Sequence, residues 1–245
     1  MEEKKVIQPD EDFSVFIVPS YEPDGRLVTM LKDMHERGLT SVIVDDGSGP
    51  DYADFFTRAA SYGHVLTHEV NKGKGCAIRT ALTYIRDTYD GDFTVVTVDS
   101  DGQHKIEDAL NILSYAREHR DTLVLGSRPL NNDIPFRSRL GNSLTRGIYH
   151  MVSHTKVHDT QTGLRAFSSD LIQTMIDIEG ERYEYEMNVL LYCPYMNLRI
   201  KEITITQIYE NNNEGSHYNP FKDSARIFRV IMKFVRNRRK IRHNG

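Results

Sequence analysis

Short apolar segments rich in Val and Ile alternate with longer amphipathic segments through the first half of this 245-residue chain. This alternation is typical of βα units wound around a mostly parallel sheet. Each expected strand is apolar and rich in Val or Ile, as a strand buried on both faces should be. We therefore expect an α/β fold with a mostly parallel sheet flanked by helices. The expected strands are 13–18, 41–44, 64–67, 93–98 and 122–125, and the expected helices are 25–37, 74–88 and 105–119.

The second half of the chain is less regular. Its pattern predicts helices over 140–154 and near 185–192, and a strand near 198–206. Because no repeat or linker interrupts it, we expect this half to be built onto the same sheet. The expected organisation is an N-terminal tail over 1–12, one globular domain over 13–220, and a basic amphipathic C-terminal helix over 221–245.

Composition excludes several classes of protein. The two cysteines, Cys76 and Cys193, are too few for a disulfide framework and lie in no Cys/His cluster. The acidic N-terminus does not resemble a secretory signal, and no apolar run approaches the roughly 20 residues of a membrane span. We expect a cytoplasmic protein that contacts the inner face of a membrane peripherally. The oligomeric state stays open, and a homodimer is one arrangement that the sequence allows.

The run DSDGQ at 99–103 follows directly after an apolar strand. Two carboxylates at positions i and i+2 can converge on one hard cation, which favours a Mg²⁺ or Mn²⁺ site shared with substrate phosphates. Such a metal would neutralise a departing diphosphate. The same residues also occur in capped turns, where Asp and Gly make local hydrogen bonds.

Three other polar loops follow expected strands, and in an open α/β sheet such loops meet at one edge. They are PSYEP at 19–23, DDGS at 45–48 and NKGKG at 71–75. The last opens a helix, where backbone N–H groups and lysines suit phosphate. It lacks the spacing of a P-loop, and a helix start with solvated lysines is the alternative interpretation.

In chain order, the motifs at 19–23, 45–48, 71–75 and 99–103 each follow a strand, and together they resemble family 2 glycosyltransferases of the GT-A fold. The resemblance implies a nucleotide-sugar donor and a divalent metal, Mg²⁺ or Mn²⁺. It also implies site residues: Pro19, Tyr21, Glu22 and Asp46 for the nucleoside, Lys74 near the sugar diphosphate, and Asp99, Asp101 and Gln103 for the metal. The family's usual Asn-Glu after the tyrosine is replaced by Glu22-Pro23 in this chain.

Three later motifs resemble the dolichyl- and polyprenyl-phosphate sugar synthase branch of that family. They are GSR at 126–128, RSRLGNS at 137–143 and DTQTGLR at 159–165. The resemblance implies that Arg128, Arg139 and Ser143 grip a lipid phosphate and that Arg165 contributes to substrate binding. Guanidinium groups bind phosphate through paired hydrogen bonds, although surface ion pairs would also explain arginines here.

The expected reaction is inverting transfer of a hexose from a UDP- or GDP-sugar to a polyprenyl phosphate. Because a phosphate acceptor is already anionic, Arg128 and Arg139 would only have to position it. A sugar-hydroxyl acceptor, as in polysaccharide or cell-surface glycan synthesis, would need a base, for which Asp159 and Glu186 are the candidates. Structural roles for these two carboxylates stay open.

Two basic amphipathic segments are candidates for peripheral membrane contact. An apolar stripe with four-residue spacing runs through the expected helix at 140–154, although any core-packed helix shows the same pattern. From Lys222 onward nine Lys and Arg accompany a single acid, Asp223, which favours anionic lipid headgroups. The acidic body argues against nucleic acid. A noncatalytic nucleotide-sugar-binding protein remains the alternative from another functional class.

Overall fold

The computed structural model describes residues 7–8, 10, 12–128, 147, 149–150, 156–206, 229, 232–234 and 236. Within this part of the chain, seven strands form one sheet in the order β3-β2-β1-β4-β6-β5-β7. The strands are β1 (Ser14–Ser20), β2 (Thr40–Asp45), β3 (His64–Thr67), β4 (Thr94–Thr97), β5 (Thr122–Ser127), β6 (Arg165–Ser168) and β7 (Arg199–Thr204). Strands β1 to β4 pair in parallel, and so do β5 and β7. Strand β6 lies antiparallel between β4 and β5.

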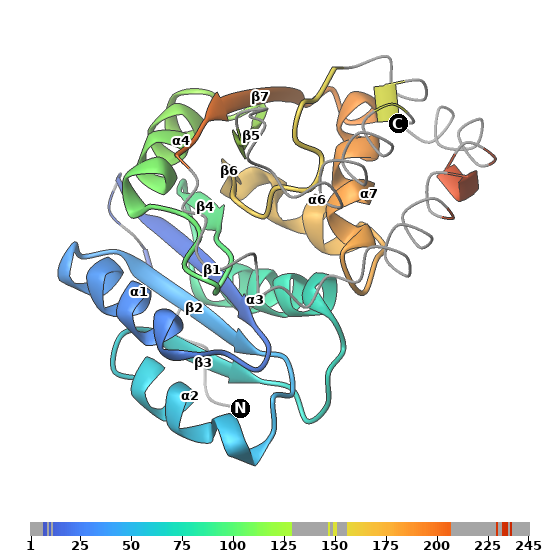
Figure 1. The fold of residues 1–245 in the computed structure, drawn as a ribbon. Coiled ribbons are helices and arrows are strands. Elements are labelled where there is room, and N and C mark those ends of the chain that lie inside the picture. Colours follow the sequence, from blue (N-terminus) through green and yellow to red (C-terminus); the bar gives the residue numbers. More distant parts are fainter. Residues whose placement is uncertain are drawn as a thin grey trace, which may run out of the picture.

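Helices cover both faces of this sheet (Figure 1). They are α1 (Gly25–Glu36), α2 (Ala53–Ala59), α3 (Lys74–Thr88), α4 (Ile106–Glu118), α6 (Ile172–Asp177) and α7 (Glu184–Tyr192). Helix α1 begins where the Asp24 carboxylate accepts a hydrogen bond from the N–H of Arg26, and α3 begins after Gly73 in a left-handed conformation. The mostly parallel α/β architecture expected from the sequence is confirmed.

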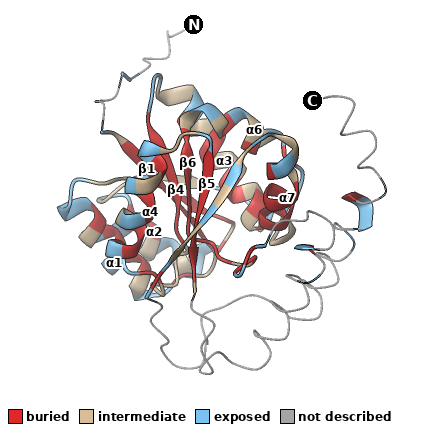
Figure 2. Cartoon of the chain, turned by 90° about the horizontal axis from the view of Figure 1, so that it is seen from above, coloured by how far each residue is buried: buried red, intermediate tan, exposed pale blue. Residues whose placement is uncertain are grey.

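The strands divide the core into two apolar clusters. Along β1, Val15 and Ile17 pack with α3, α6 and α7, whereas Phe16 and Val18 pack with α1, α2 and α4. This division follows from the two-residue period of a strand, which sends successive side chains to opposite faces. Figure 2 shows the buried strands between helices with exposed outer faces.

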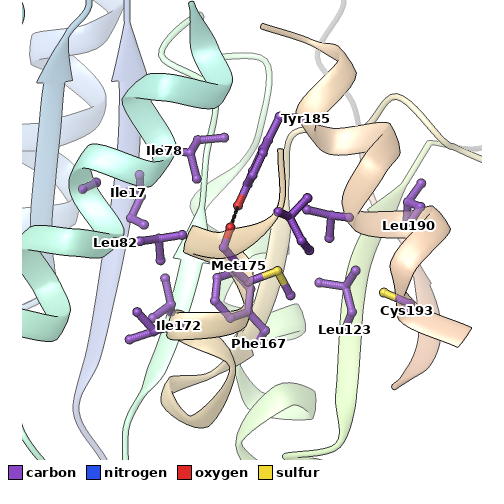
Figure 3. Packing of buried hydrophobic residues seen from close by; sticks show 14 of the residues in the cluster. Ile17, Ile78, Leu82, Leu123, Phe167, Ile172, Met175, Tyr185, Leu190 and Cys193 are labelled. Atoms are coloured by element: carbon purple, nitrogen blue, oxygen red, sulfur yellow. Dashed lines mark hydrogen bonds between the residues drawn. The ribbon is translucent and has the colours of Figure 1, made fainter. Parts of the chain in front are cut away.

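The first cluster also contains residues of β6, α6 and α7, from the second half of the chain (Figure 3). The hydroxyl of Tyr185 donates to the carbonyl of Met175 at 2.8 Å, which links α7 to α6 inside the cluster. Cys193 is fully buried there, and burial raises the pKa of its thiol to about 12. Both cysteines are unpaired, as expected for structural thiols.

Every strand expected in the first half is present, and its ends differ from the expected ones by at most two residues. The expected burial on both faces is wrong for β3, an edge strand that is only partly buried. Among the described α-helices and strands, α2, α6 and the antiparallel strand β6 were not predicted. The expected helix at 140–154 lies outside the described residues except for 147, 149 and 150, and the C-terminal segment except for 229, 232–234 and 236. In that segment Phe234 is buried, with its ring edge-on to Tyr192 and Tyr195. No helix in the described part is long and apolar enough to cross a bilayer.

Candidate functional site

The candidate site lies at the edge of the sheet where the parallel strands end. In the register of the sheet, the last residues of β1 and β2 are neighbours, Ser20 beside Asp45. Strand β5 runs parallel to β4 because each is antiparallel to β6, so Arg128 after β5 reaches the same edge. The segment 159–164 leads into β6 and therefore also comes to this edge. Loops from both halves of the chain meet there, as open α/β sheets require of a ligand site.

Lys74, the first residue of α3, lies between two carboxylates from distant parts of the chain. Its Nζ lies 2.6 Å from Asp99 Oδ1 and 2.8 Å from Glu186 Oε1. The ring of Tyr183 covers the ammonium, with its centroid 5.8 Å from Nζ. Burial disfavours the charge of Lys74, but the charges of Asp99 and Glu186 outweigh burial and raise its pKa. Lys74 is therefore a fixed cation at this edge.

Asp99 and Asp101 form a pair of like charges. Burial opposes the ionisation of Asp99, but Lys74 and His104 outweigh it and lower its pKa; His104 Nε2 lies 3.5 Å from Asp99 Oδ2. Burial and then the charge of Asp99 raise the pKa of Asp101, whose Oδ1 accepts from the N–H of Gln103 at 3.0 Å. A hard cation would relieve this repulsion.

The donor set at this turn fits a divalent cation by its chemistry. Two carboxylates and the carboxamide oxygen of Gln103 are the oxygen ligands that Mg²⁺ and Mn²⁺ prefer. The described residues contain no group of three or more His, Cys, Asp or Glu side chains already arranged to hold a metal. The remaining ligands would have to come from substrate phosphates and water, which is usual for Mg²⁺.

Gly163 leaves space for the Asp99 carboxylate. A Cβ on this glycine would lie 2.3 Å from Asp99 Oδ2 and 2.4 Å from Oδ1, closer than any real contact. The hydroxyl of Thr97, at the end of β4, donates to the Gly163 carbonyl at 2.7 Å and fixes the approach. Gly163 was not predicted as a site residue, because only the tertiary fold brings it to Asp99.

Asp46 is buried within its own group of loops. Its Oδ1 accepts from the N–H of Lys72 at 2.9 Å and its Oδ2 from the N–H of Gly73 at 2.7 Å. The imidazole of His68 lies 2.8 Å from Oδ1 through Nδ1 and 3.0 Å from the Thr80 hydroxyl through Nε2. These contacts let Asp46 shape the turn that delivers Lys74. A contact between Asp46 and a nucleoside stays a prediction.

The loop after β1 carries the other residues expected to contact the nucleoside. Pro19 lies inside β1 and is buried, whereas Tyr21 and Glu22 are partly exposed beyond the strand. Glu22 has a φ of 49°, and its N–H donates to the Ser48 hydroxyl at 2.9 Å, which joins this loop to the loop after β2. The pKa of Tyr21 is raised, most strongly by a hydrogen bond with Glu22 and less strongly by burial.

Arg128 and Asp159 form a paired contact at the second-half side of the edge. Arg128 Nε and Nη2 donate to Asp159 Oδ2 and Oδ1 at 2.5 and 2.8 Å, and its N–H reaches Oδ2 at 3.3 Å. The Asp159 side chain is 1% exposed and that of Arg128 is 25% exposed. Burial raises the pKa of Asp159, but Arg128 outweighs burial and lowers it. The predicted partners Arg139 and Ser143 lie outside the described residues.

Arg165 is buried and binds backbone carbonyls of two segments. Its Nε donates to the Thr162 carbonyl at 3.0 Å and its Nη1 to the Glu186 carbonyl at 2.8 Å. Glu186 in turn directs its carboxylate to Lys74, with a side chain only 6% exposed. The structure therefore gives Arg165 a bracing role between β6 and α7, while its predicted contact with substrate stays a prediction.

Several residues of this edge were missed by sequence reasoning. Tyr183 and His104 contact Lys74 and Asp99, respectively. Each lies within five residues of a predicted site residue, and this proximity was the only local signal. The pairing of Lys74 with Glu186 joins residues 112 positions apart, which no local pattern could indicate.

Comparison with known proteins gives matches along most of the chain. The model of the family described as glycosyl transferase family 2 matches residues 15–175. A UDP-N-acetylglucosamine–dolichyl-phosphate N-acetylglucosaminyltransferase of Methanococcus voltae is 24% identical over 238 residues, covering 88% of this chain and 94% of its own. A dolichyl-phosphate beta-glucosyltransferase of Saccharomyces cerevisiae is 25% identical over 232 residues, covering 81% of this chain and 68% of its own.

Among solved structures, a glucosyl-3-phosphoglycerate synthase of Mycobacterium tuberculosis, crystallised with Mn²⁺, UDP-glucose and phosphoglyceric acid, has a similar fold. The match has a TM-score of 0.68 with 16% sequence identity, and it covers 91% of this chain and 80% of that structure. At this level of identity the likeness concerns the arrangement of helices and strands.

Proposed function

The chain belongs to glycosyl transferase family 2, and on that premise we propose that it transfers a hexose from a UDP- or GDP-sugar to a polyprenyl phosphate. One observation carries the proposal: Arg128 lies at the same edge of the sheet as Asp99, Asp101 and Lys74. A cation for an acceptor phosphate and charged groups for a donor diphosphate thereby share one edge. The names of the two relatives, both dolichyl-phosphate glycosyltransferases, support the same acceptor class.

On the donor side, the proposed metal ligands are Asp99, Asp101 and Gln103, with Mg²⁺ or Mn²⁺ as the ion. When bound, the ion would supply positive charge that stabilises the departing nucleoside diphosphate. Lys74 would add a second positive charge close to that ion, because its ammonium lies 2.6 Å from the proposed metal ligand Asp99. Pro19, Tyr21, Glu22 and Asp46 are proposed to form the wall against the nucleoside.

On the acceptor side, a phosphate oxygen would attack the anomeric carbon while the bond from that carbon to the donor diphosphate breaks. A phosphate monoester is anionic at neutral pH, so no proton has to be removed. The two candidate bases are both in ion pairs, Asp159 with Arg128 and Glu186 with Lys74, which fits a reaction without a general base. Direct displacement inverts the anomeric configuration, and we propose this outcome.

The placement of the enzyme follows from the acceptor. A polyprenyl phosphate is embedded in a bilayer, so we propose peripheral contact at the cytoplasmic face through the basic segment 221–245. The same proposal treats residues 13–220 as the catalytic domain and 1–12 as a tail. Within the segment 221–245, Phe234 is buried against Tyr192 and Tyr195.

The test is a transfer assay with purified protein, a panel of UDP- and GDP-sugars, Mg²⁺ or Mn²⁺ and a short polyprenyl phosphate. We expect both nucleoside diphosphate and glycolipid to form. Arg128→Ala should lose glycolipid synthesis and keep slow donor hydrolysis. Arg120→Ala is the control. Arg120 lies just before β5, at the opposite edge of the sheet, where it pairs with Asp92 and Asp170. Diphosphate release without glycolipid in the unaltered enzyme would instead indicate a hydroxyl acceptor.

A further inference from the structure

Glu202, in the middle of β7, is bound by two backbone N–H groups and one imidazole nitrogen from a segment more than 40 residues earlier. The N–H of His158 lies 2.9 Å from both Glu202 oxygens, and the N–H of Asp159 lies 3.0 Å from Oε1. The imidazole Nδ1 of His158 lies 2.8 Å from Oε2. Hydrogen bonds to a carboxylate are the stronger kind, so this one side chain fixes the orientation of the 158–159 peptide.

The orientation of that peptide determines where the Asp159 carboxylate lies. The Asp159 side chain is attached next to the backbone N–H that binds Glu202. Its Oδ1 also accepts a hydrogen bond from the N–H of Gln161 at 3.2 Å. Held at both sides, its carboxylate meets Arg128 Nε and Nη2 together. A shift of the peptide would therefore move the guanidinium of Arg128.

The pairing of β5 with β7 places Glu202 close to Arg128. In the parallel pairing of β5 and β7, Glu202 is the register partner of Leu125, three residues before Arg128. One strand of the pair thus delivers Arg128 and the other delivers Glu202, while the 158–159 peptide bridges them. The Glu202 side chain is 16% exposed, whereas that of His158 is 62% exposed, so the carboxylate is largely shielded from solvent and the imidazole is not.

We propose that Glu202 is a positioning residue for the acceptor: through the 158–159 peptide and Asp159, it directs the guanidinium of Arg128 toward the phosphate of the incoming lipid. This inference rests on the proposed function, in which Arg128 binds that phosphate. Glu202 itself need not touch substrate. A carboxylate is required because only a group with two acceptor oxygens can take the His158 and Asp159 N–H groups and the imidazole together.

The test is a set of steady-state measurements on Glu202→Gln. Glutamine replaces one acceptor oxygen by an NH₂ group, which would face an N–H donor. We expect the KM for polyprenyl phosphate to rise about tenfold, because this corresponds to the loss of roughly one hydrogen bond to a charged group. The KM for the nucleotide sugar and the rate of donor hydrolysis without acceptor should not change. Glu202→Asp, which keeps two oxygens, should restore part of the acceptor affinity.

Asp121→Asn is the matched control. Asp121 pairs with Arg199 at 2.5 Å and joins the same two strands at their other end, with both side chains more than half exposed. It should leave both KM values unchanged. If Glu202→Gln lowers the melting temperature and slows donor hydrolysis and transfer equally, with no change in the KM for the lipid, Glu202 is only a structural staple and the inference is wrong.

A double mutant separates this inference from the proposed function. Arg128→Lys alone should raise the KM for polyprenyl phosphate, and adding Glu202→Gln should raise it no further, because both changes act on one contact. A full additional tenfold rise in the double mutant would show that Glu202 does not act through Arg128. If Arg128→Lys leaves the KM for the lipid unchanged, the acceptor role of Arg128 itself fails, and the inference that depends on it falls with it.

Discussion

Asp99 lies against Gly163 with no space for an additional carbon atom. Gly163→Ala should push the carboxylate away from Lys74, since the new Cβ would lie 2.3 Å from Oδ2. Displacement of a reacting group by about 1 Å can cost roughly 100-fold, so we expect a loss of about that size in kcat/KM for the donor. Donor turnover measured with and without acceptor tests this expectation.

Gly25→Ala is the control for that substitution. Gly25 begins α1, and a Cβ there would meet nothing within 4 Å. The variant should keep full turnover and gain up to about 1 kcal/mol in free energy of unfolding, because alanine is the better helix former. Full turnover by Gly163→Ala would mean that the position of Asp99 seen here is not needed for catalysis.

The ion pair of Arg128 and Asp159 makes stability depend on pH in a defined direction. Because the pKa of Asp159 is lowered in the folded protein, the pair stabilises fully above the ordinary Asp pKa of about 3.9 and is lost as pH falls through the lowered value. Asp159→Asn should cost about 3 kcal/mol at neutral pH, since it leaves Arg128 uncompensated. Urea unfolding at a series of pH values should show this difference shrinking below about pH 4. A difference that is constant from pH 3 to 7 would contradict the assignment.

At the scale of elements, β6 is joined to α7 by one buried side chain. Arg165 is the register partner of Thr97 in β4 and Leu125 in β5, and its guanidinium binds the carbonyls of Thr162 and Glu186. Arg165→Met keeps much of the volume and leaves both carbonyls without this donor. Each orphaned buried acceptor costs about 1–3 kcal/mol, so urea unfolding should show a loss of about 2–6 kcal/mol.

Arg86→Met is the control for the bracing role of Arg165. Arg86 lies exposed on α3, where it binds Asp87 and Gln173. Its replacement should change the free energy of unfolding by no more than about 0.5 kcal/mol. If Arg165→Met instead unfolds at the original urea concentration and raises the KM for the donor, Arg165 binds substrate, as the resemblance implies, and does not brace the sheet.

The first five strands and the long helices could be predicted because their signals are local. Strands β1, β2, β4 and β5 are buried and are mostly apolar, whereas the edge strand β3 is only partly buried. Helices α1, α3 and α4 each repeat apolar residues at helical spacing. Strand β6 has only four residues, RAFS, with one charged side chain. It forms because β4 and β5, from 94–97 and 122–127, supply hydrogen bonds on both sides. The short helices α2 and α6 carry too few turns for a clear period.

The same distinction applies to the site. Asp99, Asp101 and Lys74 could be placed at one edge because each lies in the connection that follows a strand of a parallel sheet, or at its end. The sequence could not show that Lys74 binds Glu186 or that Asp159 pairs with Arg128, because those contacts depend on how the second half folds back. Nor could the sequence show that the backbone N–H groups of Lys72 and Gly73 donate hydrogen bonds to the Asp46 carboxylate.

At the scale of the whole molecule, the site joins parts of the chain that are far apart in the sequence. Lys74 and Asp99 come from the first half, whereas Glu186 and Arg128 with Asp159 reach the edge through β5, β6 and α7. Ligands that bridge these groups should therefore stabilise the molecule as a unit. Binding to the folded state alone adds a free energy of unfolding set by ligand concentration and affinity.

We therefore expect the correct nucleotide sugar, together with Mn²⁺, to raise the melting temperature. At about 100 times its dissociation constant a ligand adds roughly 2.7 kcal/mol, which for a domain of this size corresponds to about 5–10 °C. EDTA should remove most of the shift, because two like-charged carboxylates repel a diphosphate when no cation lies between them. Asp101→Asn should show little shift, because it lacks one of the proposed metal ligands. Scanning UDP- and GDP-sugars by thermal unfolding would then identify the donor without an acceptor. An equal shift in EDTA and in Asp101→Asn would mean that Lys74 and the backbone bind the diphosphate without metal, and the proposed role of the 99–103 turn would be wrong.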